Sequence, residues 1–166
     1  MVLPSDKNQI LYLYSIAVTE GFSVMAVELC AAQIISPYYG NNLAVWTTVL
    51  GITLIALATG YFSGGKFAQK NIQQTTLGWL LLLAAMLIVS IPLVANNLIS
   101  LLDSLSWQTG WTLLSLLVIF PSLFILGTIP PILIHFLSIS NKESGKTSGK
   151  VFTISTIGNI FAAFLL

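Results

Sequence analysis

Long apolar runs are the feature that most constrains how this chain can fold. There are five, separated by short polar segments, and they cover roughly residues 10–35, 43–64, 77–99, 110–139 and 151–166. At about 1.5 Å per residue, an α-helix over any of the first four can cross a hydrocarbon core of about 30 Å. The fifth, as about 24 Å of helix, predicts only a partial crossing. We therefore expect an all-α, polytopic helical bundle, a single transmembrane domain over residues 1–166, with four full spans and a partial fifth.

Composition favours a membrane protein over a water-soluble one. Of the residues, 56% are hydrophobic and only 7% are charged, whereas a soluble domain carries about a quarter charged residues to cover its surface. The chain has six lysines, no arginine and a net charge of +1, so it offers no basic patch for nucleic acid. We expect the lipid bilayer to surround it, and no nucleic-acid partner.

The lysines predict the orientation of the bundle. They are Lys7, Lys66, Lys70, Lys142, Lys146 and Lys150. If the spans alternate in direction, all six fall on one side of the membrane, and the positive-inside rule makes that side cytoplasmic, together with the N-terminus. The segments expected on the other side, residues 36–42 and 100–109, contain no lysine.

Two acidic residues, Glu20 and Glu28, interrupt the first apolar run. An ionised side chain near the middle of a span costs about 2.5–3.5 kcal/mol on insertion scales, so intramembrane acids are candidates for function. On a helix the two glutamates are separated by about 12 Å and about 80°, so both can border one cavity. One interpretation is a proton or cation site. The other is a protonated glutamate that is hydrogen-bonded for structure.

Small residues near the end of the second run predict close helix packing. Gly60 and Gly64 have the spacing that lets two helix backbones approach, and Gly65 follows directly. His135 lies near the end of the fourth run, where we expect a hydrogen-bonded packing residue, with a proton-linked role as the alternative. No group of histidines and cysteines has metal-ligand spacing, so we expect neither a metal site nor a cofactor.

The fourth run contains Pro121, Pro130 and Pro131, which predict kinks or a broken helix. After it, residues 145–150 invite comparison with a phosphate-binding loop. The required spacing between the glycines is missing, and Val151 stands where serine or threonine is needed. We therefore expect a flexible loop there. No catalytic set of side chains appears, so the chain is not expected to be an enzyme by itself.

The stretch from Glu28 to Lys70 resembles the start of the membrane region in bacterial spermidine synthase-like proteins that are fused to a transporter-like, major facilitator-like part. The matching positions are Glu28, Pro37-Tyr38-Tyr39-Gly40, Trp46, Gly60-Tyr61 and Gly64-Gly65-Lys66. A weaker similarity covers residues 149–166. Two positions depart from the family pattern: Gln33 replaces an arginine that would pair with Glu28, and Gln69 replaces an acidic residue.

The resemblance implies a transporter-like membrane module in a bacterial inner membrane. Family members continue into an aminopropyltransferase-type domain, and nothing of that domain is present in this sequence. We therefore expect a subunit of a larger membrane assembly with one or more protein partners. Its candidate intramembrane site comprises Glu20, Glu28 and Gln33, where the two glutamates bind a proton or a cationic solute such as a polyamine. The alternative is a non-transporting anchor or scaffold for a soluble enzyme or a secretion partner. An enzymatic role would need a catalytic domain from another chain.

Overall fold

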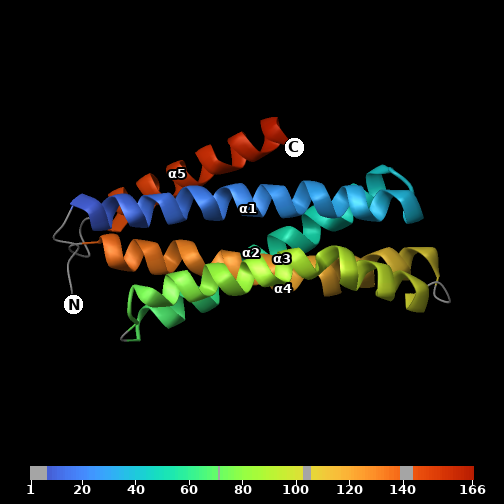
Figure 1. The fold of residues 1–166 in the computed structure, drawn as a ribbon, viewed down its shortest axis with the longest axis horizontal. Coiled ribbons are helices and arrows are strands. Elements are labelled where there is room, and N and C mark those ends of the chain that lie inside the picture. Colours follow the sequence, from blue (N-terminus) through green and yellow to red (C-terminus); the bar gives the residue numbers. More distant parts are fainter. Residues whose placement is uncertain (1–6, 71, 103–105, 139–143) are drawn as a thin grey trace.

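Five α-helices make up almost all of the computed structural model, which describes residues 7–70, 72–102, 106–138 and 144–166. They are α1 (Lys7–Tyr39), α2 (Leu43–Ala68), α3 (Thr75–Leu102), α4 (Trp107–Leu137) and α5 (Ser144–Leu165) (Figure 1). No strand occurs within the described ranges. Each helix is long and apolar enough to cross a membrane. The all-α fold expected from the apolar runs is confirmed.

The turn between α1 and α2 shows how the polar segment ends one helix and begins the next. α1 ends at Tyr39, and Gly40 follows with a φ of +84°, a left-handed conformation that glycine adopts easily and that commonly closes helices. The Gly40 N–H donates to the Ser36 carbonyl at 2.8 Å. Asn42 then caps α2, since its side-chain oxygen accepts a backbone N–H of the first turn at 3.0 Å. α1 thus continues through Pro37, beyond its expected end.

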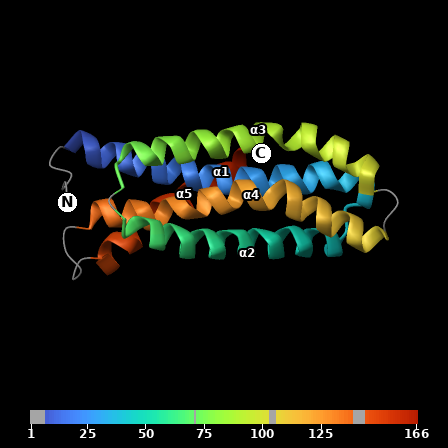
Figure 2. The same ribbon diagram turned by 90° about the horizontal axis from the view of Figure 1, so that it is seen from below.

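α1 and α4 form the centre of the bundle, because each of them contacts all four other helices. α2 and α3 pack mainly along α4, and α5 packs mainly along α1. The start of α1, the end of α2, the start of α3, the end of α4 and the start of α5 lie at the same end of the bundle (Figure 2). The helices therefore alternate in direction, and the described lysines gather at this end, which we call the lysine end. They are Lys7, Lys66, Lys70, Lys146 and Lys150; Lys142 lies outside the described residues.

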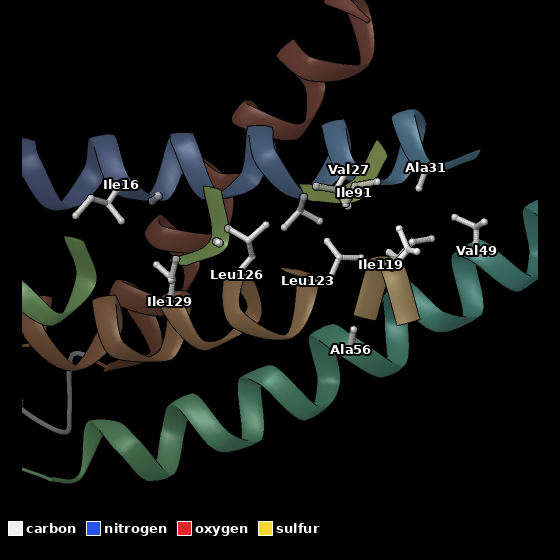
Figure 3. Close-up of a cluster of buried hydrophobic side chains, with 14 of the residues drawn as sticks. Ile16, Val27, Ala31, Val49, Ala56, Ile91, Ile119, Leu123, Leu126 and Ile129 are labelled. Atoms are coloured by element: carbon white, nitrogen blue, oxygen red, sulfur yellow. The ribbon is translucent and has the colours of Figure 1, made fainter. Parts of the chain in front are cut away.

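Apolar side chains fill the space between the two central helices (Figure 3). Ile119, Leu123 and Leu126 of α4 are buried and recur every three or four residues, so they share one face of the helix. Val27 and Ala31 of α1 belong to the same cluster. The outward faces of the bundle are also apolar, which suits contact with lipid. On α3 the exposed large side chains include Trp79, Met86, Val89 and Leu93.

The fifth helix is longer than the apolar run that predicted a partial span. α5 begins at Ser144, so residues 145–150, expected as a flexible loop, form its first turns. Polar side chains at the end of a membrane helix can face water while the backbone keeps its intrahelical hydrogen bonds. The helix therefore reaches 22 residues, or about 33 Å, enough for a full crossing.

α4 runs without a break from Trp107 to Leu137, through Pro121, Pro130 and Pro131. Of the two expected outcomes, kinks or a broken helix, the broken helix is therefore wrong. Each proline removes only one backbone donor, and a helix surrounded by neighbours tolerates that loss. α4 is such a helix, because it packs against all four others.

Candidate functional site

Glu20 lies in the interior of α1, where its side chain is only 2% exposed. Ile16, Ala17 and Val24 are also buried, and their spacing places them on the same face of the helix as Glu20. The carboxyl group is therefore inside the bundle and not on its outer surface. Its Oε2 atom accepts a hydrogen bond of 2.8 Å from Ser155 Oγ of α5. This bond joins two helices that are far apart in the sequence.

Two glycines bring α5 close enough for this hydrogen bond. A Cβ atom added at Gly21 of α1 would collide with the backbone carbonyl of Ser155, and one added at Gly158 of α5 would collide with the carbonyl of Val18. Any larger residue at either position would push the helices apart. We refer to Glu20, Gly21, Ser155 and Gly158 as the α1–α5 site.

The electrostatic surroundings of Glu20 contain no close cation within the described part of the chain. The described lysines lie near helix ends, and no ion pair reaches the carboxylate. Tyr61 of α2 lies within electrostatic range of Glu20. Its ring meets Phe152 of α5 edge to face, with 6.1 Å between the ring centroids. Among the described residues, the hydrogen-bond partner of the Glu20 carboxyl group is therefore the Ser155 hydroxyl, and Tyr61 packs against the same helix, α5.

The structure does not bring Gln33 to this site. Gln33 is exposed, and five residues on a helix correspond to about 140° of rotation away from Glu28. Glu28 itself is half-buried on α1. Within the described residues no hydrogen bond or ion pair reaches its carboxylate. Of Glu20, Glu28 and Gln33, only Glu20 is enclosed and hydrogen-bonded within the described residues.

Gly60 and Gly64 lie where α2 touches α4. A Cβ atom at Gly60 would stand 2.6 Å from the Phe124 carbonyl oxygen, and one at Gly64 would stand 2.5 Å from the Thr128 carbonyl oxygen. Gly65 lies outside this contact, because an added Cβ would meet no atom within 4 Å. The reason is geometric, since consecutive helical residues point about 100° apart. The expected packing role therefore does not extend to Gly65.

His135 is exposed near the lysine end of α4, and its ring contacts the neighbouring Phe136 at a centroid distance of 5.8 Å. The ring contact is a packing contact, although no hydrogen bond of the imidazole is found among the described residues. Among the described residues, no three histidine, cysteine, aspartate or glutamate side chains gather as a metal site would require.

Ser155 is the site residue that the sequence did not reveal. The buried residues of α5 are Val151, Ser155, Gly158 and Ala162. Their alternating spacing of four and three residues marks one helix face, and three of the four are small. That pattern could have indicated a close helix contact, although not its partner.

Comparison with known proteins yields no matching family model, curated protein or solved structure. The chain is thus defined by its fold and its site: five helices able to cross a membrane, with a buried carboxylate hydrogen-bonded between α1 and α5.

Proposed function

We propose that this chain is a transporter-like module of a bacterial inner membrane and that Glu20 binds a proton or a cationic solute during transport. The observation that carries the proposal is the burial of Glu20 inside the bundle, with Ser155 of α5 as its hydrogen-bond donor. An intramembrane acid is costly to maintain and marks ion or proton pathways in many membrane proteins. The similarity to the membrane region of spermidine synthase-like proteins also supports a transporter-like module.

The module acts as a subunit of a larger membrane assembly. Transporter sites commonly lie between two structural repeats near the middle of the membrane, and a five-helix unit supplies one side of such an arrangement. The partner is a second copy of this chain or a different membrane protein. The gathering of lysines at one end of the bundle supports an orientation with that end and the N-terminus in the cytoplasm.

Uptake measurements in proteoliposomes test this function. Wild-type protein is expected to increase the flux of protons or of a cationic solute above that of protein-free liposomes. Glu20→Gln removes the charge, keeps the size, and is expected to abolish the increase, and Glu28→Gln reports whether the second acid takes part. Equal flux in wild type and in both variants would rule out an intramembrane carboxylate site.

The alternative function is a non-transporting anchor or scaffold for a soluble enzyme or a secretion partner. The observation in its favour is the lysine end, which presents Lys66, Lys70, Lys146 and Lys150 on exposed positions. It predicts a soluble protein that co-purifies with the chain and no solute flux at all. Binding of an adenosyl cofactor by the purified chain alone would instead favour an enzymatic role.

A further inference from the structure

We infer that the species exchanged at Glu20 is a proton, and not a metal cation or a polyamine. The inference rests on the proposed transport function and narrows it to one substrate class. It follows from the space around Glu20, from the ligands available there and from the charges that face it.

The contact between α1 and α5 is too close to admit a larger cation between the two helices without separating them. Glu20 is 2% exposed, and the next residue, Gly21, lies directly against the backbone of Ser155. Gly158 makes the reciprocal contact with Val18 of α1. A polyamine or a hydrated ion would have to separate the two helices, whereas a proton requires no additional volume.

The side chains near Glu20 also offer few oxygen ligands for a metal cation. Hard cations take about six or more oxygen ligands, and the described side-chain partner of the carboxylate is Ser155 alone. Asn159, one turn further along α5, has a buried Oδ1 atom with no hydrogen-bond partner. Even with this oxygen, the side chains would supply only a carboxylate, a hydroxyl and an amide.

The groups that face Glu20 provide no positive charge to hold it ionised. From α2 the ionisable group within electrostatic range is Tyr61, and a phenol carries no positive charge in either protonation state. The described residues of α3 contain no ionisable side chain, and those of α4 contain only the exposed His135. On α5 the ionisable groups are Lys146 and Lys150, both exposed in its first turns.

Protonation removes the charge without requiring any counter-ion. In the exchange, the carboxylic acid of Glu20 releases a proton to water and becomes a carboxylate, and the reverse step restores the acid. Ser155 Oγ donates to Oε2 in the structure, which leaves Oε1 as the atom that carries the proton. The hydroxyl can keep the same hydrogen bond in both states, since an acid and a carboxylate each have an oxygen that accepts.

Infrared difference spectroscopy of the full-length protein in liposomes, recorded across a pH change, tests this inference independently of transport. The C=O stretch of a protonated carboxylic acid is expected to appear as the pH falls and to be lost in Glu20→Gln. Ser155→Ala is expected to shift the frequency of this band by removing its hydrogen bond. Thr156→Val is the matched control, because that neighbouring hydroxyl is exposed and donates to Phe152 of its own helix at 2.7 Å, so the band should not move.

Flux measured in the same liposomes separates failure of the inference from failure of the function. Proton flux that is lost in Glu20→Gln, with no uptake of sodium, potassium or spermidine, supports the proton as the substrate. Uptake of any of those three that depends on Glu20 and on Asn159, without a Glu20 band, would overturn the inference and keep the transport function. A Glu20 band that responds to pH, without flux of any solute, would support proton exchange at Glu20 and refute the transport function. A wild-type spectrum without a Glu20 band at any pH would overturn the inference.

Discussion

Replacing Gly64 by alanine tests how tightly α2 packs on α4, and Gly65 provides its control. A Cβ atom at position 64 would lie 2.5 Å from the Thr128 carbonyl oxygen and 2.7 Å from the Thr128 Cα. Ordinary contacts of a Cβ atom begin near 3.4 Å, so the helices must separate by about 0.9 Å along the closest line. Both opposing atoms belong to the backbone and cannot rotate away. At Gly65 the same methyl group meets nothing within 4 Å.

The expected cost follows from comparing the two variants. Inserting an extra methyl group into a well-packed contact costs about 1–3 kcal/mol. Alanine also favours a helix over glycine by up to about 1 kcal/mol, but this gain is common to both positions and cancels in the difference. We therefore expect Gly64→Ala to be less stable than Gly65→Ala by about 1–3 kcal/mol, with Gly65→Ala as stable as the wild type or slightly more stable.

Unfolding of the purified protein in mixed micelles, followed by circular dichroism as the fraction of denaturing detergent rises, measures this difference. Each variant is compared with the wild type at the same protein concentration, because association of subunits would also shift the transition. Coincident transitions for Gly64→Ala and Gly65→Ala would refute the close packing of α2 on α4.

Two further predictions concern the α1–α5 contact and the orientation of the chain. Ser155→Ala leaves the buried carboxylate without its donor, so the protein should lose about 1–3 kcal/mol of stability in the same assay, whereas Thr156→Val should change little; equal losses would contradict the hydrogen bond between the helices. In a Cys30→Ser background, a membrane-impermeant thiol reagent applied from outside the cell should label Asn41→Cys and not Lys70→Cys, and the opposite pattern would reverse the proposed orientation.

The number and type of the elements could be predicted from the sequence because the bilayer sets the length of an apolar helix. The helix ends could not, since polar residues also continue a helix beyond the hydrocarbon. α5 is the clearest case: Ser144 begins the helix, although the apolar run starts only at Val151. The apolar composition shows which residues are kept away from water. It does not show at which residue the helix begins or ends.

Glu20 could be predicted as a candidate from the cost of a charge in a membrane, but Ser155 could not be predicted as its partner. Serine and threonine hydroxyls in a helix usually donate to a carbonyl of their own helix, as Thr153 and Thr156 do on α5. The sequence does not show which hydroxyl turns toward another helix. Here the close contact at Gly21 selects the Ser155 hydroxyl, because it brings that part of α5 against α1. That contact depends on two helices at opposite ends of the chain.

The measurement that tests the central claim most directly is the initial rate of proton flux into proteoliposomes that contain equal amounts of wild-type protein, Glu20→Gln or Thr156→Val. If Glu20 of the α1–α5 site carries the transported proton, the wild type and Thr156→Val should support the same rate. The rate of Glu20→Gln should then fall to that of protein-free liposomes. A Glu20→Gln protein that is folded and as fast as the wild type would contradict the claim.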